Sequence, residues 1–184
     1  MRKFIISGIM AVLLSGCAGS GSNTPDAPYG FKWGQTPEEL SELNLNELDC
    51  TETSDGGKLC SSLESPDIKK QFFMTVFSPE GKGLNGISRF GLWSRDQTVL
   101  LSEYDKINAE MEAQYGQPEG INEEYDRNTP FLEKIAKGKI GQFKRKYEKE
   151  GVEIVVGIVS NANLVRIIDE NDLTYTVLTM YTLK

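Results

Sequence analysis

Side chains suited to catalysis are scarce in this chain of 184 residues, because it contains no histidine. The Ser-His-Asp and Cys-His arrangements, HExxH sites and most zinc centres are therefore excluded. The patterns SxxK and GxSxG are also missing from the sequence. We expect a protein that is not an enzyme; an enzyme would have to rely on carboxylate or metal chemistry.

Three polar motifs could still carry chemistry. Glu123-Glu124, with Asp126 nearby, could form a glycosidase pair, but such a pair is defined by its separation in space, and a solvated loop is the simpler expectation. Residues 169–172 (DEND) lack EF-hand spacing and predict a polar turn. Residues 81–86 match GxGxxG, but the chain continues as a strand where a nucleotide site needs a helix, so we expect a hairpin loop. We therefore expect no cofactor or metal ion.

Two of the three cysteines flank a turn signal, Asp-Gly. If residues 54–56 form the loop, Thr53 faces Gly57, and counting outward places Cys50 opposite Cys60. Opposed residues of a hairpin can meet disulfide geometry, above all at a non-hydrogen-bonded pair. We expect a disulfide; the alternative is a two-cysteine metal or redox site, for which neither CxxC spacing nor a histidine is present.

The third cysteine ends a short N-terminal apolar segment. Arg2 and Lys3 precede an apolar run over residues 4–14, which is too short to span a bilayer, and the run ends in Leu14-Ser15-Gly16-Cys17. This pattern resembles the lipobox of bacterial lipoproteins. The resemblance implies cleavage after Gly16, a diacylglyceryl group on the Cys17 thiol and an acylated amine. The alternative is a buried N-terminal helix with an incidental cysteine.

The lipobox divides the chain into a signal peptide (1–16), a lipidated flexible tether (17–28) and one globular domain (29–184). Ala18 follows the cysteine, which in lipoproteins of a Gram-negative host implies the outer membrane, on its periplasmic side. Removing residues 1–16 leaves 18 basic and 27 acidic side chains, a formal charge of −9. An acidic body is repelled by anionic lipid headgroups and does not suit a nucleic acid partner.

Helix and strand signals alternate along the domain. Thr36-Pro37-Glu38-Glu39 reads as a capping box that opens a short helix. A longer helix follows Ser94 or Asp96 and ends at Gly116; its apolar stripe is Leu100, Tyr104, Ile107, Met111 and Tyr115. Besides the cysteine hairpin, the predicted strands are 71–77, which is apolar on both faces and hence central, 87–93, 140–149, 152–160, 164–168 and 173–183.

This order predicts an α+β fold in which two helices pack on one face of an antiparallel sheet or sheets. One helix followed by four strands would occur twice, in the halves 29–95 and 96–184. The sequence itself shows no side-chain repeat between the halves, so the duplication is an architectural hypothesis.

The first half also shows a weaker resemblance over residues 29–78. The aromatic-rich start Tyr29 to Trp33, the Gly34-Gln35-Thr36 cap and the cysteine hairpin are similar to the unit shared by BamE-type outer-membrane lipoproteins and the β-lactamase inhibitor protein. The resemblance implies a helix before antiparallel strands and a protein that binds other proteins without catalysis. The second half departs from it, because residues 94–101 lack Gly-x-Thr.

One region is basic in this acidic chain: Lys134, Lys137, Lys139, Lys144, Arg145, Lys146 and Lys149. A solvated strand edge explains it. The alternative is a docking patch around Lys139, Lys144, Arg145 and Lys146 for an anionic glycan, a lipopolysaccharide phosphate or an acidic protein loop. Trp33 and Trp93 are expected in the core, although one of them could anchor a partner.

We therefore expect an envelope lipoprotein that binds an envelope protein through its sheet or this basic edge. The alternative is a carrier or sensor of a small apolar or glycan ligand, held in a groove between helix and sheet.

Overall fold

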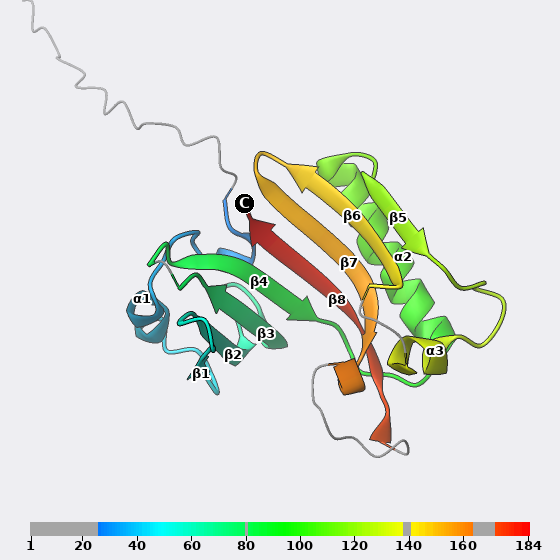
Figure 1. Ribbon diagram of the computed structural model, residues 1–184, viewed down its shortest axis with the longest axis horizontal. Helices are drawn as coiled ribbons and strands as arrows, with labels where there is room; N and C mark the ends of the chain where they lie inside the picture. Colours follow the sequence, from blue (N-terminus) through cyan, green and yellow to red (C-terminus); the bar gives the residue numbers. More distant parts are fainter. Residues whose placement is uncertain (1–25, 80, 138–140, 164–171) are drawn as a thin grey trace, which may run out of the picture.

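One antiparallel sheet of eight strands organises the protein (Figure 1). The computed structural model describes residues 26–79, 81–137, 141–163 and 172–184. The strands are β1 Asp49–Glu52, β2 Lys58–Glu64, β3 Lys69–Phe77, β4 Leu84–Phe90, β5 Gly120–Glu123, β6 Phe143–Lys149, β7 Val152–Ser160 and β8 Tyr175–Leu183. They lie side by side in the order β1-β2-β3-β4-β8-β7-β6-β5, so the contact between β4 and β8 joins the two halves into a single sheet.

Several predictions fall on residues that the structure does not describe. They are the signal peptide, the lipidated Cys17 and the tether as far as residue 25, together with Lys139, the strand 164–168 and most of the polar turn 169–172. These predictions stay predictions.

The helices are α1 Pro37–Glu42, α2 Gln97–Tyr115 and α3 Leu132–Lys137, with short 3-10 turns η1 Pro28–Gly30 and η2 Asn161–Asn163. The predicted capping box opens α1. The Thr36 hydroxyl accepts a hydrogen bond from the Glu39 amide at 3.2 Å, and the Glu39 carboxylate accepts one from the Thr36 amide at 2.7 Å. These two bonds satisfy amide groups that a helix start leaves unpaired.

The long helix α2 begins and ends as the sequence predicts. Asp96 caps it by accepting from the Thr98 amide at 2.8 Å, and Gly116 follows it with a φ of 89°. Leu100, Tyr104, Ile107 and Met111 are buried against the sheet, and Tyr115 packs at the margin of the same cluster.

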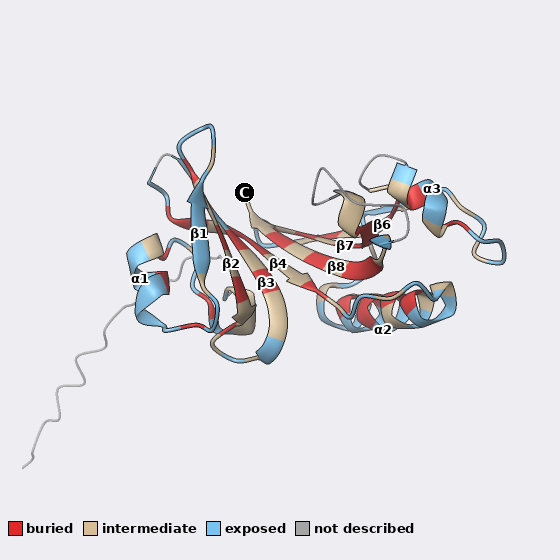
Figure 2. Ribbon diagram, turned by 90° about the horizontal axis from the view of Figure 1, so that it is seen from below, coloured by how far each residue is buried: buried red, intermediate tan, exposed pale blue. Residues whose placement is uncertain are grey.

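Both α1 and α2 lie on the same face of the sheet. Leu40 of α1 packs in a cluster with Phe73 and Ile87, whereas α2 packs in a cluster with Ile154 and Tyr181. Ile87 lies directly opposite Tyr181 across the β4–β8 pair, and opposed residues point to one face. We call this the helix-covered face, and the other the helix-free face; Figure 2 shows α2 along one side of β6, β7 and β8.

The second half differs from the predicted unit in two elements. Residues 120–123, expected as polar loop, form the edge strand β5, and residues 132–137 form the unpredicted helix α3. The strand is short and polar, so it shows no period-two apolar pattern; it pairs with β6 from Gly120 to Glu123. The helix is only six residues long and half charged, so it shows no apolar stripe; its Ile135 is buried in the α2 cluster.

Among the described residues, no helix is long and apolar enough to cross a membrane.

Candidate functional site

A disulfide fixes the edge of the sheet at the β1–β2 hairpin. Cys50 lies opposite Cys60 in the strand register, as the sequence predicts, and the two sulfur atoms are bonded. At the turn, the Thr53 amide donates to the Gly57 carbonyl at 2.9 Å, and Gly56 adopts a φ of 86°. Cys60 is buried under α1, so the bond pins the exposed strand β1 to the core of the first half.

The helix-free face carries an apolar groove of about 620 Å³ that begins beside this hairpin. The side chains that line it are Asp49, Thr51, Leu59, Ser61, Leu63, Phe72, Met74, Trp93 and Asn161. Asp49 belongs to β1 and Asn161 follows β7, five places away in the strand order. Since both line one groove, the sheet curves around its helix-free face.

Aromatic rings form one wall of the groove. The Phe72 and Phe90 rings lie 5.1 Å apart, and the Phe90 and Trp93 rings stack at 6.3 Å. Trp93 remains 40% exposed. The prediction of a core position is therefore wrong for Trp93, because none of the helices in the described residues covers this face beside β4. Trp33, in contrast, is partly buried and packs against both core clusters.

The sequence contained a signal for the groove. The segment 71–77 is apolar on both faces, which predicts an interior strand, and β3 is indeed paired on both sides. Phe73 and Phe77 are buried on the helix-covered face, whereas Met74 is half-buried and Val76 exposed on the other. An apolar strand with one uncovered face thus explains where the open apolar surface comes from.

The prediction of a solvated strand edge for the basic region is wrong, because β6 is paired on both sides, with β5 and with β7. The described residues of the alternative, a docking patch, do not form one surface either. Lys139 lies outside the described residues, and Lys144 and Lys146 alternate with Arg145 on opposite faces of β6. Lys146 pairs with Glu153 at 2.7 Å on the helix-free face. Arg145 turns toward α2 instead, so the structure separates it from its two neighbours.

Arg145 belongs to a row of ion pairs on the helix-covered face. It contacts Glu112 of α2 and Glu123 of β5, each at 2.9 Å, and Glu123 also pairs with Arg127 at 3.4 Å. The Tyr104 hydroxyl donates to Glu123 at 3.1 Å. Burial, reinforced by the charge of Glu123, raises the pKa of Tyr104.

The structure also shows what is done by the carboxylates considered as a glycosidase pair and expected in a solvated loop. Glu123 forms ion pairs with both arginines, and Glu124 accepts a hydrogen bond from the side-chain amide of Gln142 at 3.2 Å. Asp126 accepts from the Asn128 amide at 2.9 Å, which closes a turn. Glu123 and Glu124 therefore link the end of β5 to the β6 region, whereas the contact of Asp126 is local. The expectation of a solvated loop is wrong for Glu123, which ends a strand.

The GxGxxG segment (81–86) is a hairpin loop only in its first half: residues 81–83 lie between β3 and β4, and residues 84–86 already belong to β4. The Ser78 amide donates to the Gly83 carbonyl at 3.1 Å, and Gly83 has a φ of 72°. A Cβ on Gly83 would lie 2.1 Å from the Gly34 carbonyl oxygen. The glycine is thus required by a close approach between two backbones.

A second cavity, of about 430 Å³, lies between α2 and the sheet, where the alternative carrier function would need one. The Tyr29 hydroxyl donates to the Tyr181 hydroxyl at 3.4 Å, and the Arg89 guanidinium lies 6.0 Å from the Tyr29 ring centroid. Burial raises the pKa of Tyr181. Asp26 and Ala27, the first described residues, line the same cavity, so the N-terminal segment packs against this face.

No family model, no curated protein and no solved structure matches the chain. The resemblances to lipoproteins and to the BamE-type unit therefore stay predictions. Within the described part of the chain, no three histidine, cysteine, aspartate or glutamate residues lie close enough to hold a metal ion.

Proposed function

We propose that this protein is a non-catalytic envelope lipoprotein, anchored through an acylated Cys17, that binds another protein in the groove of its helix-free face. One observation carries the proposal: both α1 and α2 cover the same face, and the open face keeps a continuous apolar groove with Trp93 at its wall. Tryptophan in an apolar depression is the kind of anchor that dominates protein interfaces.

The position of the N-terminal segment supports this arrangement. Asp26 and Ala27 lie beside α2 on the helix-covered face, and eight residues separate Asp26 from Cys17. Fully extended, that length reaches about 30 Å. The described part of the chain thus begins on the face opposite the groove, which leaves the groove open to a partner in the aqueous space of the envelope, on the outer membrane in a Gram-negative host.

A photo-crosslinking experiment in cells tests the proposal. A benzophenone side chain is placed at Met74, inside the groove, or at Val99, which is 49% exposed on α2. We expect one defined envelope protein to be captured from Met74 and not from Val99, and capture to be lost when Trp93 is alanine. In a Cys17→Ser variant the tether is not acylated, and we expect capture to fall with it. Equal capture from both positions, or none, would contradict the proposal.

A small apolar ligand, held in this groove and not in the smaller cavity between α2 and the sheet, is the second candidate. Its volume of about 620 Å³ favours this reading, because pockets for small molecules measure about 300–1,000 Å³. Organic extraction of the purified protein, followed by mass spectrometry, distinguishes the candidates: a stoichiometric lipid or other apolar compound that the Trp93→Ala variant loses would favour the carrier.

A further inference from the structure

Strand β1 forms a free edge of the sheet next to the groove. It pairs only with β2, and within the described residues no other backbone pairs with its outer side. Thr53 is hydrogen-bonded across the hairpin turn. Because hydrogen-bonded and non-hydrogen-bonded residues alternate along an antiparallel pair, the backbone groups of Thr51 and Asp49 also point toward β2. The amide and carbonyl groups of Cys50 and Glu52 therefore point outward.

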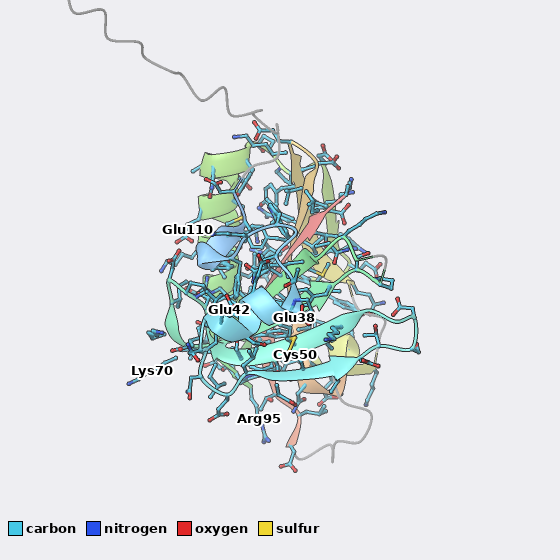
Figure 3. The ribbon with its side chains drawn as sticks, turned by 90° about the vertical axis from the view of Figure 1, so that its left-hand side faces the viewer. Glu38, Glu42, Cys50, Lys70, Arg95 and Glu110 are labelled. Atoms are coloured by element: carbon cyan, nitrogen blue, oxygen red, sulfur yellow. A yellow bond between two sulfur atoms is a disulfide. The ribbon has the colours of Figure 1, made fainter. Side chains whose placement is uncertain are left out.

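The two flanks of this edge differ in chemistry. On the helix-free side lie Asp49, Thr51 and the apolar groove. On the helix-covered side lie Glu52 of β1 and the exposed Glu38 and Glu42 of α1. Figure 3 looks onto this edge and shows α1, with Glu38 and Glu42, beside the hairpin that carries Cys50. Lys58 of β2 is already paired with Glu38, at 3.8 Å.

We propose that the partner supplies an extended segment, alternating apolar and basic residues, that adds as a strand to β1. This inference rests on the proposed function and specifies its partner. Side chains of an added strand alternate between the two faces with period two. Apolar residues then enter the groove while lysine or arginine residues meet Glu52 and the glutamates of α1, and backbone hydrogen bonds to Cys50 and Glu52 add affinity.

Other occupants of the edge fit less well. A second copy of the chain would bring a body with a formal charge of −9 against an acidic edge. The chain's own tether, residues 18–28, contains no basic residue and no apolar residue larger than proline or alanine. The disulfide favours the addition of a strand from another protein, because it holds Cys50 in place before binding. The backbone of β1 then loses less conformational entropy when the partner binds.

A peptide binding experiment on the full-length protein in detergent micelles tests the inference. The probe is a fluorescent octapeptide in which valine and lysine alternate, followed by anisotropy. Two derivatives carry backbone N-methyl groups, on all lysines or on all valines. In an antiparallel pair, directly hydrogen-bonded residues share a face, so the lysine amides would bond to Cys50 and Glu52. We expect the lysine-methylated peptide to bind at least about tenfold more weakly. The valine-methylated peptide should retain its affinity.

Matched variants of the protein test the charge pattern. Glu52→Lys reverses a charge at the edge, and Glu110→Lys makes the same change at an exposed site on α2 (Figure 3). We expect Glu52→Lys to weaken the peptide about tenfold or more at low salt. The Glu110→Lys variant should bind normally. Equal effects of the two methylations, or of the two charge reversals, would overturn the inference.

The outcome separates the inference from the proposed function. If the partner captured from Met74 is retained by the Glu52→Lys variant, the groove binds a partner but β1 does not pair with it, and the inference alone fails. If the peptide behaves as expected while Met74 captures nothing in cells, the strand edge is competent and the proposed function fails.

Discussion

Two glycines of the β3–β4 loop offer a controlled test of how the N-terminal segment is attached to the sheet. Gly81 and Gly83 have nearly equal φ angles, 71° and 72°, so an alanine carries the same left-handed strain at either position. That strain costs about 1–2 kcal/mol. The surroundings differ: a Cβ on Gly81 meets nothing within 4 Å, whereas one on Gly83 lies 2.1 Å from the Gly34 oxygen.

The contact at Gly83 cannot be relieved without separating two backbones. Gly34 donates to the Leu84 carbonyl at 2.9 Å, and Leu84 donates to the Gln35 carbonyl at 2.8 Å. Each bond contributes about 0.5–1.5 kcal/mol, so lengthening both adds about 1–3 kcal/mol. We expect Gly81→Ala to lower the free energy of unfolding by about 1–2 kcal/mol, and Gly83→Ala by about 2–5 kcal/mol.

Urea unfolding of both variants, with the slope against urea compared with that of the parent, measures the difference. If Gly83→Ala costs no more than Gly81→Ala, the close approach between the loop and the segment at Gly34 does not exist in solution. The described packing of the first half would then be refuted.

Three further outcomes follow from the site and its core. Asn108→Ala should lower the free energy of unfolding by about 1–3 kcal/mol, because the buried Tyr147 hydroxyl loses the acceptor it reaches at 2.7 Å; Tyr147→Phe in the same background should restore part of the loss in urea unfolding. The hydrogen bond from Lys146 lowers the pKa of Glu153. The pair therefore stabilises the fold above the pKa that Glu153 has in the unfolded chain, and this stabilisation is lost as the pH falls through its lower pKa in the folded protein. Glu153→Gln should make the free energy of unfolding less dependent on pH below about pH 4.5, and an unchanged acid profile would count against the pair. Trp93→Ala should change the free energy of unfolding by less than about 1.5 kcal/mol, because the residue is 40% exposed; a larger loss would make Trp93 a core residue and not a binding residue.

The sequence predicted best those elements whose signals are local. The capping box at Thr36, the stripe of α2 and the Cys50–Cys60 register each depend on residues within one element or one turn, where spacing translates directly into geometry. The edge strand β5 was missed because four residues cannot show a period. It is held by pairing with β6 and by the ion pair between Glu123 and Arg145, which are 22 residues apart.

The candidate site was predicted only in part. The sheet was one of the two predicted binding surfaces, but the groove depends on which face the helices leave open, and that follows from packing between distant elements. The basic edge was the other, and it fails as a single surface because a strand sends Arg145 and Lys146 to opposite faces. A run of like charges in sequence therefore became two separate sets of ion pairs.

The affinity of the captured partner for two alanine variants of the full-length protein is the most direct test of the groove. Trp93→Ala removes an aromatic wall of the groove, and Val99→Ala removes an apolar side chain of similar exposure on α2. We expect Trp93→Ala to weaken binding about thirtyfold or more, equivalent to about 2 kcal/mol, and Val99→Ala to leave it unchanged. Equal affinities of the two variants would contradict the assignment of the helix-free face as the binding surface.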